Sequence, residues 1–177
     1  MYKTAVLIVI GLAVLGTGDV QGVMVDFYDN AVIQEGDQYY RVSIFDDSIV
    51  VMAGGEVGQM LGYDSSTTTV LDGEVGWFEL RDSATAHLYG GTFDTLYAPV
   101  ADACFHIYGY DLTLAEYVSS AFLSGFWADG TAFDLTLRRT NLFGDHYVLH
   151  EIPEPAVGTF LGIGFLLLRR RKVKIVG

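Results

Sequence analysis

Cysteine is nearly absent from this chain: Cys104 is the only one among 177 residues. A single cysteine excludes an internal disulfide and the paired-cysteine spacing of structural zinc sites. Cys104 lies in an Ala-Asp-Ala-Cys-Phe segment, which predicts a small core residue. The motifs Gly-x-Ser-x-Gly and His-Glu-x-x-His and the phosphate-binding glycine loop are also absent. The sequence therefore predicts no enzyme and no cofactor.

Basic residues are scarce in the central part of the chain. Residues 23–152 contain 20 acidic residues and four basic ones, a formal charge of −16. The four bases are Arg41, Arg81, Arg138 and Arg139. A domain this acidic is repelled by nucleic acid and by anionic lipid, so neither is expected as a partner of the body. The charge is typical of a well-solvated domain that holds divalent cations weakly.

The N-terminal segment has the three-part pattern of a secretory signal peptide. Lys3 supplies a positive charge, residues 5–15 form an apolar run, and residues 16–22 are mostly small or polar. This order predicts export and removal of residues 1–22, with cleavage before Val23 and Gly18 as the alternative cleavage point. An uncleaved membrane anchor is the alternative.

Two of the three prolines, Pro153 and Pro155, flank Glu154 at the start of the C-terminal segment, residues 153–177. Proline fixes φ and lacks an N–H, so this tripeptide predicts an extended junction after which a helix can begin. Residues 156–168 carry no charge and predict a short transmembrane helix of about 20 Å, against about 30 Å for a bilayer core. A buried C-terminal helix of a soluble domain is the alternative.

Basic residues follow this apolar segment directly. They predict a membrane stop that holds the end of the helix on the cytoplasmic side. The stop consists of Arg169, Arg170 and Arg171. Together with Lys172 and Lys174, these side chains are expected to contact anionic lipids of the inner membrane.

A Pro-Glu-Pro tripeptide, an apolar segment and a basic stop, in this order, resemble the PEP-CTERM sorting signal of Gram-negative bacteria. The resemblance covers residues 153–177. It implies that a membrane enzyme of the exosortase type recognises Pro153, Glu154 and Pro155 and processes the tail. It also implies a protein that is anchored in the inner membrane and then reaches the cell surface or the extracellular matrix. The chain departs from the family in its short apolar run and in residues 172–177, which continue past the arginines.

The body, over roughly residues 45–155, is similar to secreted proteins of Planctomycetes that carry the same tail. The similarity rests on short motifs, namely the Asp-Ser and Gly-Gly repeats, residues 105–111, residues 127–131 and residues 148–155. It implies an exported, repeat-containing surface protein and brings no activity with it.

An 18-residue repeat organises residues 45–110. Three sets of residues keep the spacing: Asp46, Asp64 and Asp82; Gly55, Gly73 and Gly91; and Val57, Val75 and Phe93. Asp and Gly favour turns, whereas the β-branched and aromatic residues between them favour strands. We therefore expect an all-β fold with a short β-solenoid, in which the third set stacks inside. An antiparallel meander with turns at the same glycines is the alternative.

Antiparallel strands are also expected on both sides of the repeats. Before them, residues 23–28 and 39–45 predict strands around a polar loop, residues 29–37, that cap the first coil. After them, the region 121–152 predicts a hairpin, because an Asp-Gly pair separates the alternating runs 122–127 and 132–137. Residues 146–152 are expected to form a last strand, and residues 113–120 a helical turn or two.

The repeated aspartates are the main candidates for chemistry in the body. In a solenoid, Asp46, Asp64 and Asp82 would form a ladder along one corner. Stacked carboxylates suit Ca²⁺, and paired carboxylates cleave sugars in enzymes built on β-helices. Aspartates in turns also bond to their own backbone, so the sequence favours Asx-turns over a metal site. No metal site is predicted from the four scattered histidines, His87, His106, His146 and His150.

These features predict a structural protein of the cell surface or extracellular matrix, sorted through its tail. The alternative is a carbohydrate-binding surface module with extracellular polysaccharide as its ligand. That alternative depends on seven aromatic residues that either stack on sugars or fill the core. They are Trp77, Phe78, Tyr89, Tyr97, Tyr108, Tyr110 and Trp127.

Overall fold

The computed structural model describes residues 22–100, 102–138 and 146–154. Within these ranges every regular element is a β-strand, so the all-β prediction is confirmed. No helix in the described ranges is long and apolar enough to cross a membrane. The predicted helix over residues 156–168, and all but the last residue of the predicted signal peptide, lie outside the described residues.

In chain order, the eleven strands of the described residues are β1 (Met24–Phe27), β2 (Ala31–Ile33), β3 (Gln38–Ile44), β4 (Ile49–Gly62), β5 (Thr67–Leu80), β6 (Thr85–Leu88), β7 (Thr92–Tyr97), β8 (Cys104–Glu116), β9 (Ser120–Phe126), β10 (Ala132–Arg138) and β11 (Tyr147–Glu151).

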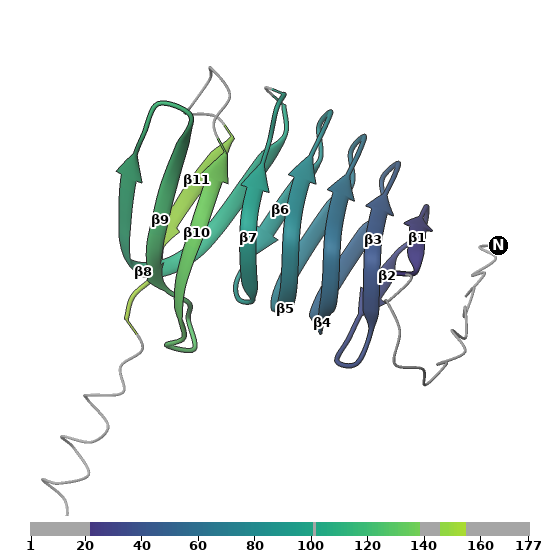
Figure 1. The fold of residues 1–177 in the computed structure, drawn as a ribbon, viewed down its shortest axis with the longest axis horizontal. Helices are drawn as coiled ribbons and strands as arrows, with labels where there is room; N and C mark the ends of the chain where they lie inside the picture. Colours follow the sequence, from purple (N-terminus) through teal and green to yellow (C-terminus); the bar gives the residue numbers. More distant parts are fainter. Residues whose placement is uncertain (1–21, 101, 139–145, 155–177) are drawn as a thin grey trace, which may run out of the picture.

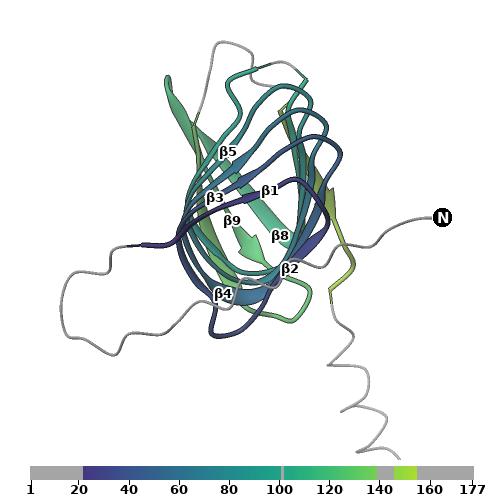
Figure 2. The same cartoon turned by 90° about the vertical axis from the view of Figure 1, so that its right-hand side faces the viewer.

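Neighbouring coils pair in parallel, in step with the sequence repeat. Glu56 lies opposite Glu74, and Glu74 lies opposite Thr92, so the chain returns to the same place with each copy of the repeat. The first part of β5 pairs with β6 and its second part pairs with β7, so one long strand contributes to both sides of a coil. The coils lie beside one another in Figure 1 and overlap in the end-on view of Figure 2. This parallel pairing is the predicted solenoid-like stacking, and it excludes the antiparallel meander for the repeats.

Columns of apolar side chains fill the inside of the stack. Val57 lies opposite Val75, and Val75 opposite Phe93, and none of the three is more than 5% exposed. Their predicted position inside the coils is therefore confirmed. A second buried column consists of Met60, Phe78 and Leu96. Burying one side chain of this size contributes about 1.5–3 kcal/mol, so each coil stabilises the stack by adding to both columns.

The two corners of each coil use different residues to reverse the chain. At one corner, Asp46, Asp64 and Asp82 have φ angles of 59°, 55° and 52°, in the left-handed region that aspartate tolerates better than most residues. At the other corner, Gly73 has a φ of 113°. A Cβ atom on Gly73 would lie 2.9 Å from two backbone carbonyl oxygens of the preceding coil. This position therefore needs glycine for its φ angle and for the close approach of the coils.

The N-terminal end of the stack differs from the prediction. Met24 in β1 lies opposite Arg41 in β3, and the two strands are parallel. The expected polar loop contains β2, which pairs in parallel with β4. An antiparallel pair at this end is therefore wrong. The reason is the apolar β2 segment, whose Ile33 is fully buried, so that the chain from β1 to β3 completes a short coil of its own.

At the opposite end, β8, β9 and β10 pair antiparallel. The predicted hairpin is confirmed, with a turn in which the Trp127 N–H donates to the Thr131 carbonyl at 2.9 Å. β10 then runs parallel to β7, so the hairpin continues the sheet of the last coil. The helical turn expected within residues 113–120 is wrong, because residues 113–116 pair with β9 as the end of β8.

β11 confirms the predicted last strand and pairs in parallel with the first part of β8. At the start of β8, Ala103 and Phe105 flank Cys104 and are fully buried, whereas Cys104 itself is half-buried. The prediction of Cys104 as a core residue is therefore wrong. Side chains alternate between the two faces of a strand, and Phe105 takes the inner face.

Candidate functional site

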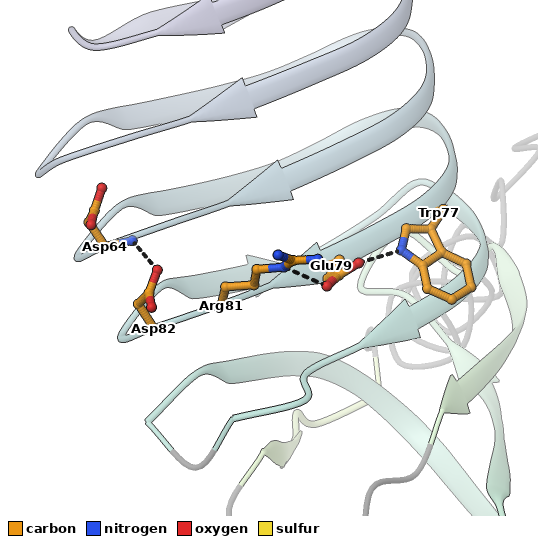
Figure 3. A network of polar contacts seen from close by, with 5 residues as sticks. All are labelled: Asp64, Trp77, Glu79, Arg81 and Asp82. Atoms are coloured by element: carbon orange, nitrogen blue, oxygen red, sulfur yellow. Dashed lines mark hydrogen bonds and ion pairs between the residues drawn. The ribbon is translucent and has the colours of Figure 1, made fainter.

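The repeated aspartates lie one above another at a corner of the coils, as Figure 3 shows for Asp64 and Asp82. A carboxylate oxygen of Asp64 accepts a hydrogen bond from the Asp46 N–H at 3.1 Å, and Asp82 accepts one from the Asp64 N–H at 3.3 Å. Each bond joins two coils, whereas an Asx-turn would keep its bond within one turn. The ladder therefore connects successive corners of the stack.

The described residues contain no group of three or more His, Cys, Asp or Glu side chains arranged to hold a metal ion. Ca²⁺ takes about six to eight oxygen ligands, whereas the aspartate ladder contributes one carboxylate per coil, at a spacing of about 4.8 Å. Two of these carboxylates already bind backbone N–H groups. The geometry favours a structural role for the ladder.

A second cluster, the Trp77 cluster, lies on the outer face of the sheet that contains β5, β7 and β10. It consists of Trp77, Glu79, Arg81, Tyr97 and Arg138. The Arg138 guanidinium lies 5.3 Å from the centre of the Trp77 ring and 5.5 Å from that of Tyr97. Glu79, only 8% exposed, accepts hydrogen bonds from the Trp77 indole at 3.1 Å and from Arg81 at 2.7 Å (Figure 3). A buried carboxylate thus fixes an indole and a guanidinium at the surface.

The arginines of the described body gather on this sheet. Arg41 in β3 lies opposite Gln59, and Gln59 lies opposite Trp77, so Arg41 shares a row with the Trp77 cluster. Together with Arg81 and Arg138, it completes the set of arginines and lysines in the described residues. The face therefore combines the few cations of an acidic domain with aromatic rings.

The predicted sugar-stacking residues divide between core and surface. Phe78 and Trp127 are 0% and 1% exposed, and the Trp127 indole donates to the Gly91 carbonyl at 3.0 Å. Both therefore belong to the core. The other five residues are half-buried or exposed on outer faces: Trp77, Tyr89, Tyr97, Tyr108 and Tyr110.

A third cluster, the histidine–tyrosine cluster, stands on β6, β8 and β11. Tyr108 stacks between Tyr89 and His150, with ring centres 4.3 Å apart on both sides. His87 stacks on His106 at 4.8 Å. The His106 Nδ1 lies 3.0 Å from the His150 Nε2, and the His87 Nδ1 lies 3.2 Å from the Tyr108 hydroxyl. The polar atoms of four rings therefore lie within hydrogen-bonding distance of one another in two pairs.

The histidine–tyrosine cluster was not predicted from the sequence. His87 and His106 lie opposite each other, but their separation in sequence exceeds the repeat length because the last coil is longer. An extended repeat would have aligned this pair, whereas His150 joins only through the non-repeating strand β11. The fourth histidine, His146, is 2% exposed, and its Nδ1 lies 3.1 Å from the Ala103 carbonyl.

The surroundings of the cluster affect its protonation. Partial burial lowers the pKa of His87, and the positive charge that His150 can carry lowers it further. Burial also lowers the pKa of His106, as do His87 and His150. His87 and His106 therefore resist protonation, because burial disfavours the charged form and because a charge on either ring would lie close to another imidazole.

Within the described residues, β-pairing ends directly before the predicted sorting motif. The Ile152 N–H donates to the Gly109 carbonyl at 2.8 Å, immediately after the last pair of β11. Pro153 and Glu154 are exposed and have no regular secondary structure. They border a shallow depression of about 320 Å³ together with Tyr110, Asp111, Glu151 and Ile152. Three more predicted site residues, Arg169, Arg170 and Arg171, and also Pro155, lie outside the described residues.

Comparison of the chain with protein-family models, with curated proteins and with solved structures gave no match.

Proposed function

We propose that this chain is a non-catalytic protein of the cell surface or extracellular matrix, exported by its N-terminal segment and sorted through its PEP-CTERM-like tail. In this proposal residues 1–22 are a signal peptide and residues 156–168 form a short transmembrane helix. An exosortase-type enzyme acts at Pro153, Glu154 and Pro155, and the basic stop contacts inner-membrane lipids until then.

The abrupt end of β-pairing carries this proposal. Backbone hydrogen bonding continues to Ile152, and the two residues that follow are exposed. A processing enzyme needs an extended, accessible backbone, which prolines favour because they interrupt regular pairing. Cleavage at this place would release the body with all its strands.

Mass spectrometry of the mature protein tests the sorting step in a host with active tail processing. We expect a C-terminus near residue 155, and Glu154→Ala should retain the tail without unfolding the body. Glu151→Ala is the matched control, because Glu151 is also exposed but belongs to β11. Replacing Arg169, Arg170 and Arg171 by alanine should impair membrane retention before processing. A wild-type protein that still ends at Gly177 would contradict sorting and would mean that the C-terminal tail is an unprocessed membrane anchor.

A second candidate function is the binding of an extracellular polysaccharide, and the Trp77 cluster favours it. Indole and phenol rings stack on sugar rings, and arginine and carboxylate groups bind sugar hydroxyls. The rings of Trp77 and Tyr97 lie on the outer face of one sheet, and the Arg138 guanidinium lies beside both rings. The acidity of the body makes a neutral polysaccharide the better ligand than an anionic one.

A glycan array, followed by titration of any ligand, tests polysaccharide binding. We expect Trp77→Ala to abolish binding and Arg138→Gln to weaken it. Tyr89→Ala, on the sheet of the histidine–tyrosine cluster, should leave binding unchanged. The absence of any hit, or equal loss in the Tyr89 variant, would remove this candidate function.

A further inference from the structure

The histidine–tyrosine cluster has no role in tail sorting or in polysaccharide binding by the Trp77 cluster. Three of the four histidines of the chain meet there, from strands that are far apart in sequence. All three are partly exposed. Imidazole nitrogen is a good ligand for copper, nickel and zinc, so the cluster concentrates metal-binding groups on an accessible sheet.

The spacing of two nitrogens in the cluster suits one metal ion. His106 Nδ1 and His150 Nε2 are 3.0 Å apart. Metal–imidazole bonds are about 2.0–2.1 Å long, so a shared metal would subtend an angle of about 90° at these nitrogens. Such an angle is that of neighbouring ligands in square-planar or octahedral coordination, which Cu²⁺ and Ni²⁺ adopt. Tetrahedral Zn²⁺ would need a wider separation of the nitrogens.

We propose that His106 and His150 bind one late first-row divalent metal ion, with Cu²⁺ preferred over Ni²⁺ and Zn²⁺. The ligand atoms are His106 Nδ1 and His150 Nε2, and water completes the coordination. Without metal, one of these two nitrogens donates a hydrogen bond to the other. Metal binding needs both lone pairs, so the proton of each neutral ring moves to, or stays on, its other nitrogen. The metal lies beside the line joining the nitrogens, and the rings turn towards it about the Cβ–Cγ bond, a torsion with broad energy wells.

Neighbouring rings stack on the two ligands and restrict how far each ligand ring turns. Tyr108 stacks on His150, and His87 stacks on His106. The His87 Nδ1 is directed to the Tyr108 hydroxyl, so His87 and Tyr108 also contact each other. His87 is therefore a positioning residue rather than a ligand. The formal charge of the body, −16, raises the local concentration of cations around the site.

The proposed metal would join two strands that are distant in sequence. His106 belongs to β8, which is part of the stack, whereas His150 belongs to β11, the last strand before the sorting tripeptide. A metal ion bound to both would cross-link β11 to the body. Because the metal binds the folded state only, it would stabilise the docking of this strand.

Copper titration of the full-length chain, with electron paramagnetic resonance as the readout, tests this site. All proteins should carry Cys104→Ser, because Cu²⁺ oxidises thiols. We expect one Cu²⁺ per chain, with hyperfine coupling to two imidazole nitrogens. His106→Gln and His150→Gln should each leave one imidazole and weaken binding at least about tenfold.

Two control variants test whether His87 or the aspartate ladder contributes ligands. His87→Gln should retain two coupled imidazoles, because His87 is not a ligand. Asp64→Asn, at the aspartate ladder, should leave copper binding unchanged. Fewer than two imidazoles in the wild-type spectrum would overturn the proposal whether or not the variants fold. Equal copper binding by the wild type and a folded His150→Gln variant would overturn it as well.

Discussion

In each coil, the aspartate at one corner is subject to two structural demands, one on its backbone and one on its side chain. Its backbone adopts left-handed φ angles of 52–59°, and the side chains of Asp64 and Asp82 accept a hydrogen bond from the preceding coil. Glycine would satisfy the first demand and fail the second. The sequence repeat of aspartate is explained by the need for both.

Substitution at Asp64 separates these two roles. Asp64→Ala loses the bond to the Asp46 N–H and places a Cβ-bearing residue without a polar group in the left-handed region. We expect a loss of about 1–3 kcal/mol in the free energy of unfolding. Asp64→Gly should lose less, because glycine adopts this φ without strain. Urea denaturation measures both, with Asp47→Ala as an exposed control that changes stability by less than about 0.5 kcal/mol. Equal losses for the alanine and glycine variants would contradict the backbone role.

Among the elements, β11 is connected to the body by the hydroxyl of Tyr147 as well as by its pairing with β8. The Tyr147 hydroxyl donates to the Leu96 carbonyl at 3.0 Å and lies 2.9 Å from the Arg138 carbonyl. It thereby connects β11 to the ends of β7 and β10. Burial raises the pKa of Tyr147 well above its usual value.

This raised pKa predicts a loss of stability at alkaline pH. The unfolded Tyr147 ionises near pH 10, whereas the folded one keeps its proton. The contribution is therefore complete below about pH 10 and is lost as the pH rises above that value. Tyr147→Phe should lower the free energy of unfolding at pH 7 by about 1–3 kcal/mol, because the Leu96 carbonyl loses its donor.

Urea denaturation between about pH 8 and pH 11 measures this dependence. The wild type should lose more stability across the range than Tyr147→Phe does. Tyr117→Phe is the matched control, since the Tyr117 side chain is 58% exposed. Parallel pH profiles for the wild type and the Tyr147 variant would contradict a role of the buried hydroxyl.

The elements also differ in how far the sequence predicts them. Strands of the repeats follow from Val57, Val75 and Phe93, because an 18-residue period indicates the inward face, whereas the choice between parallel coils and an antiparallel meander required the structure. The hairpin of β9 and β10 follows from a local turn signal. The parallel pairing of β1 with β3 and of β2 with β4 could not be predicted, because both partner strands lie beyond the polar loop. The orientation of Cys104 depends on a register that the repeat no longer determines.

The candidate sites also differ in how far the sequence predicts them. The corner ladder of Asp46, Asp64 and Asp82 could be predicted as a ladder, whereas its bonds between coils depend on side-chain geometry that the repeat does not specify. The contact of His106 with His150 could not be predicted, since it joins strands that are 44 residues apart through one non-repeating pairing. Sites that follow the repeat are visible in the sequence, and sites that connect the repeat to its end are not.

At the scale of the whole molecule, parallel stacking makes the number of coils adjustable. A second copy of residues 56–73 inserted after residue 73 adds one full repeat. Its corners and columns match both neighbours, so we expect a folded protein that is about 4.8 Å longer. Small-angle scattering and circular dichroism measure the length and the strand content.

A shorter insertion provides the control for this experiment. A copy of residues 57–73 lacks the first residue of the repeat and shifts the register, which turns inward side chains outward. We expect this variant to aggregate or to unfold at lower urea concentration. Equal stability of the two insertions would mean that stacking does not depend on the repeat length.

The parallel pairing of β11 with β8 has a mechanical consequence. Five residue pairs, from Tyr147 with Phe105 to Glu151 with Gly109, hold β11 to the body. A pull on Ile152 that is directed along β11 loads these hydrogen bonds together, in shear, whereas a pull across the strand opens them one after another. The direction in which the tail leaves the body therefore determines how much tension the body withstands before its last strand detaches.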